Sequence, residues 1–179
     1  MQKTNKQEYI SGVKKFASIF TNAAKLAEVE IGDLKKTGDT TYNFNGEYGI
    51  ENEAWIGYKY ILDNLKINKS CTGTNYSECT PRYKDLDGND VNDWGSPYLH
   101  YILSDGMTLL LTASSYPLGD QWLVDINGKK GPNVICKDAF PFWFYGDKFD
   151  YLNNYNINDI GEDCFSYILK YNNMDYLDE

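Results

Sequence analysis

Apolar residues near the start of the chain recur at the spacing of one helical face. They are Tyr9, Val13, Phe16, Phe20, Ala23, Ala24 and Ala27. Polar residues fill the positions between them, which gives the i, i+3, i+4, i+7 pattern of an amphipathic helix. The pattern predicts a helix from about residue 4 to about residue 30 that stops near Gly32. Such a helix is longer than the average in globular domains.

The next part of the chain predicts a second helix and a long loop. Apolar residues again have helical spacing from Glu51 to Lys66, so a shorter helix is expected there. The stretch from Asn68 to Asn92 is polar and predicts a loop. This loop contains Cys71 and Cys79 and ends in the acidic run Asp85–Asp90.

The second half of the chain has the residue pattern of β-strands. An Asp-Gly pair, Asp105-Gly106, stands between two apolar runs and is a strong hairpin signal. An aromatic run is predicted to be an edge strand or a segment that covers the sheet. The three predicted strands and the aromatic run are Tyr98–Leu103, Met107–Ala113, Gln121–Ile126 and Phe140–Tyr145.

The C-terminal segment from Asp163 to Tyr171 fits a short helix with Asp163 as its N-cap. Phe165, Tyr167 and Leu169 also alternate as in a strand, and we favour the helix. The order of elements, helices first and antiparallel strands afterwards, predicts an α+β fold. In this fold the long N-terminal amphipathic helix packs on an antiparallel β-sheet.

Composition and net charge limit the kinds of molecule that the chain is expected to bind. A chain of 179 residues with 42% hydrophobic residues fits one folded domain with a sizeable core. The formal net charge of -9 argues against nucleic acids and anionic membrane surfaces as partners. Basic residues near the start have the spacing of the solvated face of a helix. They are Lys3, Lys6, Lys14, Lys15 and Lys25.

The four cysteines indicate an oxidising, extracytoplasmic setting. They include no C-x-x-C pair, and His100 is the one histidine available to join them at a metal, so zinc is disfavoured. Cys71 and Cys79 are predicted to close a short loop by a disulfide, and Cys136 with Cys164 follows by elimination. Free buried thiols are the alternative.

Four segments of the chain carry motifs found in one group of known proteins. Asp93–Tyr98 is similar to a tryptophan-containing segment of major pseudopilins, although Asn92-Asp93 replaces the Asp-Pro of that family. Val124–Asn133, with Asp138 and Phe140, resembles a strand-and-loop signature of proteins with a prepilin-type N-terminus. The other two segments are Gln2–Ser18, which resembles the middle of the long pilin helix, and Cys164–Leu177, which resembles the closing segment of that group.

Together these segments resemble type IV pilin-like proteins and the pseudopilins of type II secretion systems. The resemblance implies a structural subunit of a filament and not an enzyme. The expected partners are other pilin or pseudopilin subunits and the inner membrane, reached through an N-terminal apolar helix that this chain lacks. The helical face around Tyr9, Val13, Phe16 and Phe20 is expected to pack on the sheet and on neighbouring subunits. The full-length form is expected to be membrane-anchored or part of a cell-surface filament.

The resemblance also divides the chain, which is expected to be a single soluble pilin-like domain. Residues 1–30 correspond to the C-terminal half of the pilin helix, 31–97 to a variable region, and 98–179 to the sheet and the C-terminal region. The opening of the chain has neither an export signal nor a membrane helix, so we expect it to be a truncated form.

A calcium site is predicted in the loop after the third strand. Asp125, Asn127 and Asp138 bracket glycines there, and such an oxygen-rich loop suits a hard cation. The pseudopilins that the chain resembles bind calcium in a comparable loop. The alternative is an ordinary turn in which Asp125 and Asn127 bind their own backbone.

Three further features of the sequence are expected to be structural. The run Asp85–Asp90 lacks the glycine and glutamate positions of an EF-hand and is expected to be a solvated loop, with an irregular calcium loop as the alternative. His100 lies in an apolar strand and is expected to be a packed or exposed structural residue. The tryptophans are expected to belong to the core, the alternative being a sugar-binding surface; they are Trp55, Trp94, Trp122 and Trp143.

Two functions of different class therefore remain open. The leading hypothesis is a pseudopilin or minor pilin. The other is a secreted, disulfide-bonded module that binds a ligand or glycan and depends on calcium.

Overall fold

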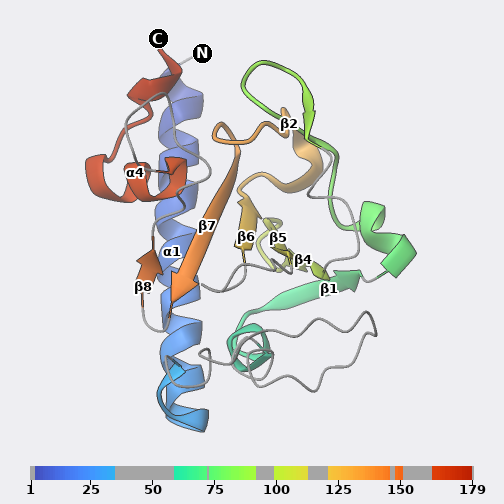
Figure 1. Ribbon diagram of the computed structural model, residues 1–179, viewed down its shortest axis with the longest axis vertical. Coiled ribbons are helices and arrows are strands. Elements are labelled where there is room, and N and C mark those ends of the chain that lie inside the picture. Colours follow the sequence, from blue (N-terminus) through green and yellow to red (C-terminus); the bar gives the residue numbers. More distant parts are fainter. Residues whose placement is uncertain are drawn as a thin grey trace.

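The computed structural model describes residues 3–34, 59–71, 73–91, 99–112, 121–145, 148–150 and 163–178. In this part of the chain a long N-terminal helix lies against a six-stranded antiparallel sheet, as Figure 1 shows. The predicted α+β class is therefore confirmed at this level.

Helix α1, Lys3–Ile31, is 29 residues long and buries one face. The buried set contains all seven residues whose spacing predicted the helix, because that spacing places them on one side of it. The helix ends at Gly32, as predicted. Gly32 has φ +87° and donates its N–H to the carbonyl of Glu28 at 2.9 Å, a conformation that glycine adopts without steric cost.

The main sheet has the strand order β1-β4-β5-β6-β7-β8, and every neighbouring pair is antiparallel. Its β4–β5 hairpin turns at Gly106, with φ +91°, where the Asp-Gly signal predicted a turn. The strands are β1 (Ile67–Cys71), β4 (Leu99–Leu103), β5 (Thr108–Thr112), β6 (Gln121–Asp125), β7 (Ala139–Tyr145) and β8 (Lys148–Asp150).

Shorter elements lie between and after these strands. They are η1 (Gly73–Glu78), β2 (Tyr83–Lys84), which pairs with β3 (Asp90–Val91), η3 (Gly128–Lys130), α4 (Cys164–Tyr171) and η4 (Asp175–Leu177). Residues 59–63 are also helical, so the second predicted helix ends before Lys66. The start of that helix, from Glu51 to residue 58, lies outside the described residues.

Two local predictions are wrong. The stretch after Asn68 is not all loop, because β1 pairs with β4 and β2 pairs with β3. The middle of β1 is exposed, as its position at the edge of the sheet allows, and so it lacks the apolar alternation that marks a strand. The run Phe140–Tyr145 is neither an edge nor a cover, because β7 pairs with both β6 and β8.

Aromatic rings fill the interface between α1 and the sheet. The ring of Phe20 is at the centre of this core, and the centroids of its neighbours lie 5.0–5.9 Å away. These neighbours are Phe16, Trp122, Phe142, Phe144 and Phe149. The rings meet mostly edge to face, the geometry that aromatic pairs prefer.

The opposite face of the sheet is more polar. Side chains alternate along a strand, and Trp122 of β6 faces α1, so Asp125 faces the other side. Thr108 of β5 is the cross-strand partner of Asp125 and shares that face. Both side chains are buried, as is His100 of β4. The buried polar side chains of the sheet therefore lie on the face that points away from α1.

The C-terminal segment returns to the start of α1. Asp163 accepts a hydrogen bond from the N–H of Ser166 at 2.7 Å, which confirms it as the N-cap of α4. Lys6 of α1 donates to the carbonyl of Met174 at 3.2 Å and forms an ion pair with Asp178. Both termini consequently lie at the same end of the molecule in Figure 1.

Gly12 marks the closest approach of α1 to the turn after β6. A Cβ atom at this position would collide with the side chain of Ile126. In an exposed helix Gly→Ala stabilises by about 1 kcal/mol, whereas overpacking in a core costs about 1–3 kcal/mol. We therefore expect Gly12→Ala to lower the free energy of unfolding by about 1 kcal/mol, measured by urea denaturation.

Matched variants separate the collision from a general effect on the helix. Ser18→Ala lies on the exposed side of α1 and is expected to leave stability within about 0.5 kcal/mol of the native chain. Gly12→Ala combined with Ile126→Ala removes the collision, so the two changes should cost less together than the sum of their separate costs. Additive costs would contradict the contact.

Candidate functional site

The predicted cation loop lies at one end of the β6–β7 pair. Asp125 is the last residue of β6, and its cross-strand partner is Ala139, the first residue of β7. Asp138 directly precedes Ala139, and its carbonyl accepts the N–H of Ile126 at 2.9 Å. The antiparallel pairing thus brings the two acidic residues together although 12 residues separate them in the chain.

Asp138 organises the connection between the two strands. One oxygen of its carboxylate accepts the N–H of Asn133 at 2.8 Å, and the other accepts the N–H of Val134 at 2.7 Å. Asn127 ties the same loop by donating its side-chain amide to the carbonyl of Gly131 at 2.9 Å. The ordinary-turn alternative concerns Asp125 and Asn127, and both make such local bonds, because Asp125 Oδ1 accepts the N–H of Asn127 and the side chain of Asn127 donates to Gly131.

Asp125 is in a different environment from Asp138. It is fully buried, and its Oδ1 accepts the N–H of Asn127 at 3.2 Å. Burial, and then the negative charge of Asp138, raise the pKa of Asp125 to about 8. In the described part of the chain no lysine or arginine forms a salt bridge with either carboxyl group. The site therefore needs a cation or a proton to balance its charge.

Two further residues surround Asp125 that sequence reasoning missed. Tyr83 of β2 and Thr108 of β5 are both buried. Burial and the charge of Asp125 raise the pKa of Tyr83 well above its usual value, and a hydroxyl contact with Thr108 acts in the opposite direction. Thr108 and Asp125 lay in two separate predicted strands whose pairing was not predicted, and Tyr83 lay in a predicted loop and had no signal.

Four side-chain oxygens of this site are buried and make no hydrogen bond of standard geometry to the described residues, although the hydroxyl of Tyr83 lies close to both Asp125 and Thr108. They are Asp125 Oδ2, Asn127 Oδ1, Tyr83 OH and Thr108 Oγ1. Buried polar atoms are nearly always satisfied in native proteins, so these oxygens form a candidate ligand site. Oxygen donors around a carboxylate suit a hard cation such as Ca²⁺. Within the described ranges there is no cluster of three or more His, Cys, Asp or Glu side chains arranged to hold a metal.

Both disulfides have the predicted pairing. Cys71 is bonded to Cys79, and Cys136 to Cys164. The second bond links the loop of Asp138 to the start of α4, and the hydroxyl of Tyr176 adds a hydrogen bond of 2.9 Å to the carbonyl of Cys136. Two disulfides are consistent with an extracytoplasmic location.

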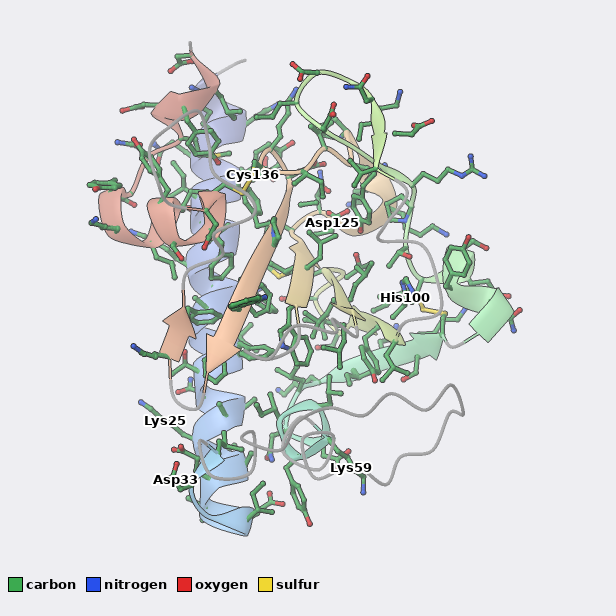
Figure 2. All side chains as sticks on the ribbon, viewed as in Figure 1. Lys25, Asp33, Lys59, His100, Asp125 and Cys136 are labelled. Atoms are coloured by element: carbon green, nitrogen blue, oxygen red, sulfur yellow. A yellow bond between two sulfur atoms is a disulfide. The ribbon has the colours of Figure 1, made fainter. Side chains whose placement is uncertain are left out.

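His100 lies beside the first disulfide, as Figure 2 shows, because Cys71 is its partner in the β1–β4 register. The residue is fully buried, and Nδ1 lies 2.8 Å from the hydroxyl of Thr80. That hydroxyl donates to the carbonyl of Tyr76, which favours the tautomer with the proton on Nδ1. Nε2 has no partner among the described residues.

The burial of His100 predicts a loss of stability in acid. Burial lowers its pKa to about 4, whereas the unfolded chain takes up a proton near pH 6.5. The stability that neutral His100 contributes to the folded state is thus fully present above pH 6.5 and is lost as the pH falls toward 4. We expect this to cost about 1–3 kcal/mol, because one unit of pKa difference corresponds to about 1.4 kcal/mol.

The measurement is urea denaturation at several pH values between 7 and 4. His100→Gln is the matched control, because glutamine keeps a polar group near Thr80 and does not titrate. The stability of the native chain relative to this variant should fall with pH. Parallel pH profiles of the two proteins would show that His100 does not titrate as described.

The acidic run and Trp122, which the sequence also suggested as binding sites, have structural roles. The carboxylate of Asp85 accepts the backbone N–H of Asn89 at 2.8 Å and its side-chain amide at 2.9 Å. The acidic run therefore forms an ordinary turn. Trp122 is fully buried against α1 and is part of the core. Trp55 and Trp94 lie outside the described residues.

The helix face that was predicted to contact neighbouring subunits is buried within the domain. Tyr9, Val13, Phe16 and Phe20 are all buried. The side of the helix left to solvent is mostly polar and charged, and near its C-terminal end it also exposes Leu26 and Val29. Its polar residues include Glu8, Ser11, Lys14, Lys15, Ser18, Asn22 and Lys25.

Comparison of the chain with protein-family models, with curated proteins and with solved structures finds no match in any of the three. Of the helices that the structure describes, none combines the length and apolar character needed to cross a bilayer.

Proposed function

We propose that this chain is the extracytoplasmic part of a type IV pilin-like or type II secretion pseudopilin subunit. The observation that carries the proposal is α1, a 29-residue helix that buries one face on an antiparallel sheet and leaves the other exposed along its length. A helix of this kind suits a subunit that packs beside copies of itself. Its role is structural, and no reaction is assigned to it.

Contacts between subunits use the exposed side of α1 in this proposal. The face with Tyr9 and Phe16 is already covered by the sheet of the same chain. An upstream apolar helix continues α1 and anchors the subunit in the inner membrane before assembly. The two disulfides support the extracytoplasmic placement of the domain.

Calcium is part of the proposal at the Asp125 site. The fit rests on the buried carboxyl groups, which form no salt bridge among the described residues, and on the buried Oδ2 of Asp125 and Oδ1 of Asn127, which make no hydrogen bond of standard geometry there. Asp125 and Asn127 would supply ligands, while Asp138 already binds two backbone N–H groups and helps to balance the charge. A bound cation would replace the proton that otherwise neutralises Asp125.

The test is the native N-terminus, read from the full coding region and from the mature protein. We expect about 20 apolar residues upstream of Gln2, a short basic leader that is cleaved before them, and a glutamate near the mature start. A conventional secretory signal peptide, or no upstream segment, would contradict the filament assignment and favour a secreted binding module.

A further inference from the structure

We propose that copies of this chain associate head to tail, with an apolar patch at the C-terminal end of α1 in one copy packed on an aromatic patch on α4 of the next. The α1 patch is defined as Leu26 and Val29, and the α4 patch as Tyr167 and Tyr171. The inference rests on the filament subunit proposed above and names the two surfaces through which its copies meet.

Four large apolar side chains are exposed in the part of the chain that the structure describes. Two of them form the α1 patch, Leu26 at 52% and Val29 at 84% exposure. The others are Leu86, in the turn between β2 and β3, and Tyr171, at the end of α4. Leu26 and Val29 are three residues apart in a helix, so they lie side by side on one face of it. Neighbouring apolar side chains in water make a candidate contact surface.

The surroundings of the α1 patch carry a net negative charge. Glu28, Glu30 and Asp33 place three carboxylates in and just after the last turn of α1, against one ammonium group on Lys25. Neither glutamate forms a salt bridge with a described residue, although Glu30 accepts a hydrogen bond from the side chain of Asn64. The negative end of the helix dipole disfavours carboxylates there, so a cationic partner would stabilise this end of α1.

The α4 patch has basic groups beside it. Its two tyrosine rings lie 4.7 Å apart, and the ammonium group of Lys170 lies 4.8 Å from the centre of the Tyr171 ring. Lys14 of α1 reaches the same place, because it donates a hydrogen bond to the side chain of Asn172. Asp175, in η4, is the acidic residue that opposes these two charges. The charge around the α4 patch therefore complements that around the α1 patch.

Charge decides which of the exposed apolar residues can meet. Two α1 patches that faced one another across a twofold axis would bring the carboxylates of both copies together. Leu86 lies between Asp85 and Asp87, so the turn between β2 and β3 does not complement the α1 patch either. The α4 patch has the opposite charge, and it is the surface that the α1 patch fits.

The two patches are too far apart to meet within one chain. Lys14 marks the level of the α4 patch along α1, and Leu26 follows it by 12 residues. At about 1.5 Å per residue, this separation is about 18 Å along the helix. Figure 2 shows Lys25 and Asp33 at the end of α1 that lies away from α4. The contact therefore joins different copies and repeats in one direction without closing, which suits an open filament.

The test is photocrosslinking of the whole chain with benzoylphenylalanine in place of Tyr171. This residue keeps an aromatic ring in the α4 patch and, when illuminated, bonds covalently to whatever lies against it. Because the two surfaces are small, a single contact is weak, and crosslinking captures it without a stable dimer. We expect covalent dimers in which mass spectrometry locates the second attachment within residues 25–33.

Leu86 provides the matched control position, because it is 47% exposed and Tyr171 is 46% exposed. Benzoylphenylalanine in place of Leu86 has a similar exposure but lies among carboxylates. It should give severalfold less dimer and no attachment within residues 25–33.

Charge variants test the complementarity directly. In the chain with the photoreactive residue at position 171, Glu30→Lys and Lys170→Glu each place like charges across the contact. Each should lower the dimer yield about fivefold, the effect of about 1 kcal/mol. The two changes together restore opposite charges between copies, so the double variant should return to the native yield. Both side chains are exposed, so the fold tolerates these changes.

Three results would overturn the inference. They are no dimer above the Leu86 control, attachment of position 171 outside residues 25–33, and a double charge variant that dimerises no better than the single ones. The filament assignment is decided separately by the native N-terminus. A chain that fails here but has a cleaved prepilin leader is a filament subunit that uses other surfaces. A chain that crosslinks as expected but follows a secretory signal peptide is a self-associating secreted module.

Discussion

Phe20→Ala is expected to lower the free energy of unfolding by about 3–5 kcal/mol, the cost typical of deleting a buried phenylalanine side chain. Phe20 has no exposed surface, and its ring contacts aromatic rings from α1, β6, β7 and β8. Alanine removes all these contacts at once and leaves a cavity that neighbouring rings fill only partly. Urea denaturation followed by far-UV circular dichroism measures the loss.

Two variants serve as controls for Phe20. Phe20→Leu keeps most of the apolar volume and should cost markedly less than alanine. Val29→Ala, also in α1 but 84% exposed, should change stability by less than about 0.5 kcal/mol. If Phe20→Ala were as mild as Val29→Ala, α1 would not pack on the sheet as described.

Removal of the Cys136–Cys164 disulfide by serine substitution at both positions is expected to cost about 3–4 kcal/mol. The bond closes a loop with a sequence separation of 28, against 8 for Cys71–Cys79. A longer closed loop restricts the unfolded chain more, so removal of the shorter link should cost less, about 2–3 kcal/mol. Denaturant unfolding of the two double variants measures the difference.

Hydrogen exchange is a second measurement for the disulfide variants, because it shows which regions of the chain lose order. Cys164 begins α4, so the loss of its bond should speed hydrogen exchange in α4 and in the loop around Asp138 before other regions. The Cys71–Cys79 variant should instead affect η1 and β1. Equal costs and identical exchange patterns would contradict the loop-length argument.

Much of the fold was predictable because the strongest patterns are local. The spacing from Tyr9 to Ala27 defines the buried face of α1, and Gly32 ends the helix. The Asp-Gly pair at Gly106 predicts the β4–β5 hairpin, and Asp163 predicts the start of α4. In each case neighbouring residues alone determine the conformation.

The failed predictions concern elements whose role depends on distant partners. Strand β1 is polar in its middle, and only its pairing with β4 makes it a strand. The segment that forms β7 was expected at an edge of the sheet or as a cover over it, and Pro141 within it argues against an inner position. Strand β8 pairs only with Trp143–Tyr145, so Pro141 lies beyond the reach of that neighbour.

The candidate site was predicted in part for the same reason. Asp125, Asn127 and Asp138 lie within one short stretch around a glycine-rich loop, so their proximity is visible in the sequence. Tyr83 reaches the site only because β2 pairs with residues around Val134, far along the chain. Sequence periodicity contains no information about that contact.

The side-by-side arrangement of α1 and the sheet has a mechanical consequence. Tension applied along α1 would load the helix–sheet interface in shear, so the contacts of Val13, Phe16 and Phe20 would resist together. The attachment of Lys6 to the C-terminal segment opposes peeling of α1 from its first turn. Because forced unfolding is governed by the unfolding rate, this geometry favours a domain that bears load along its helix.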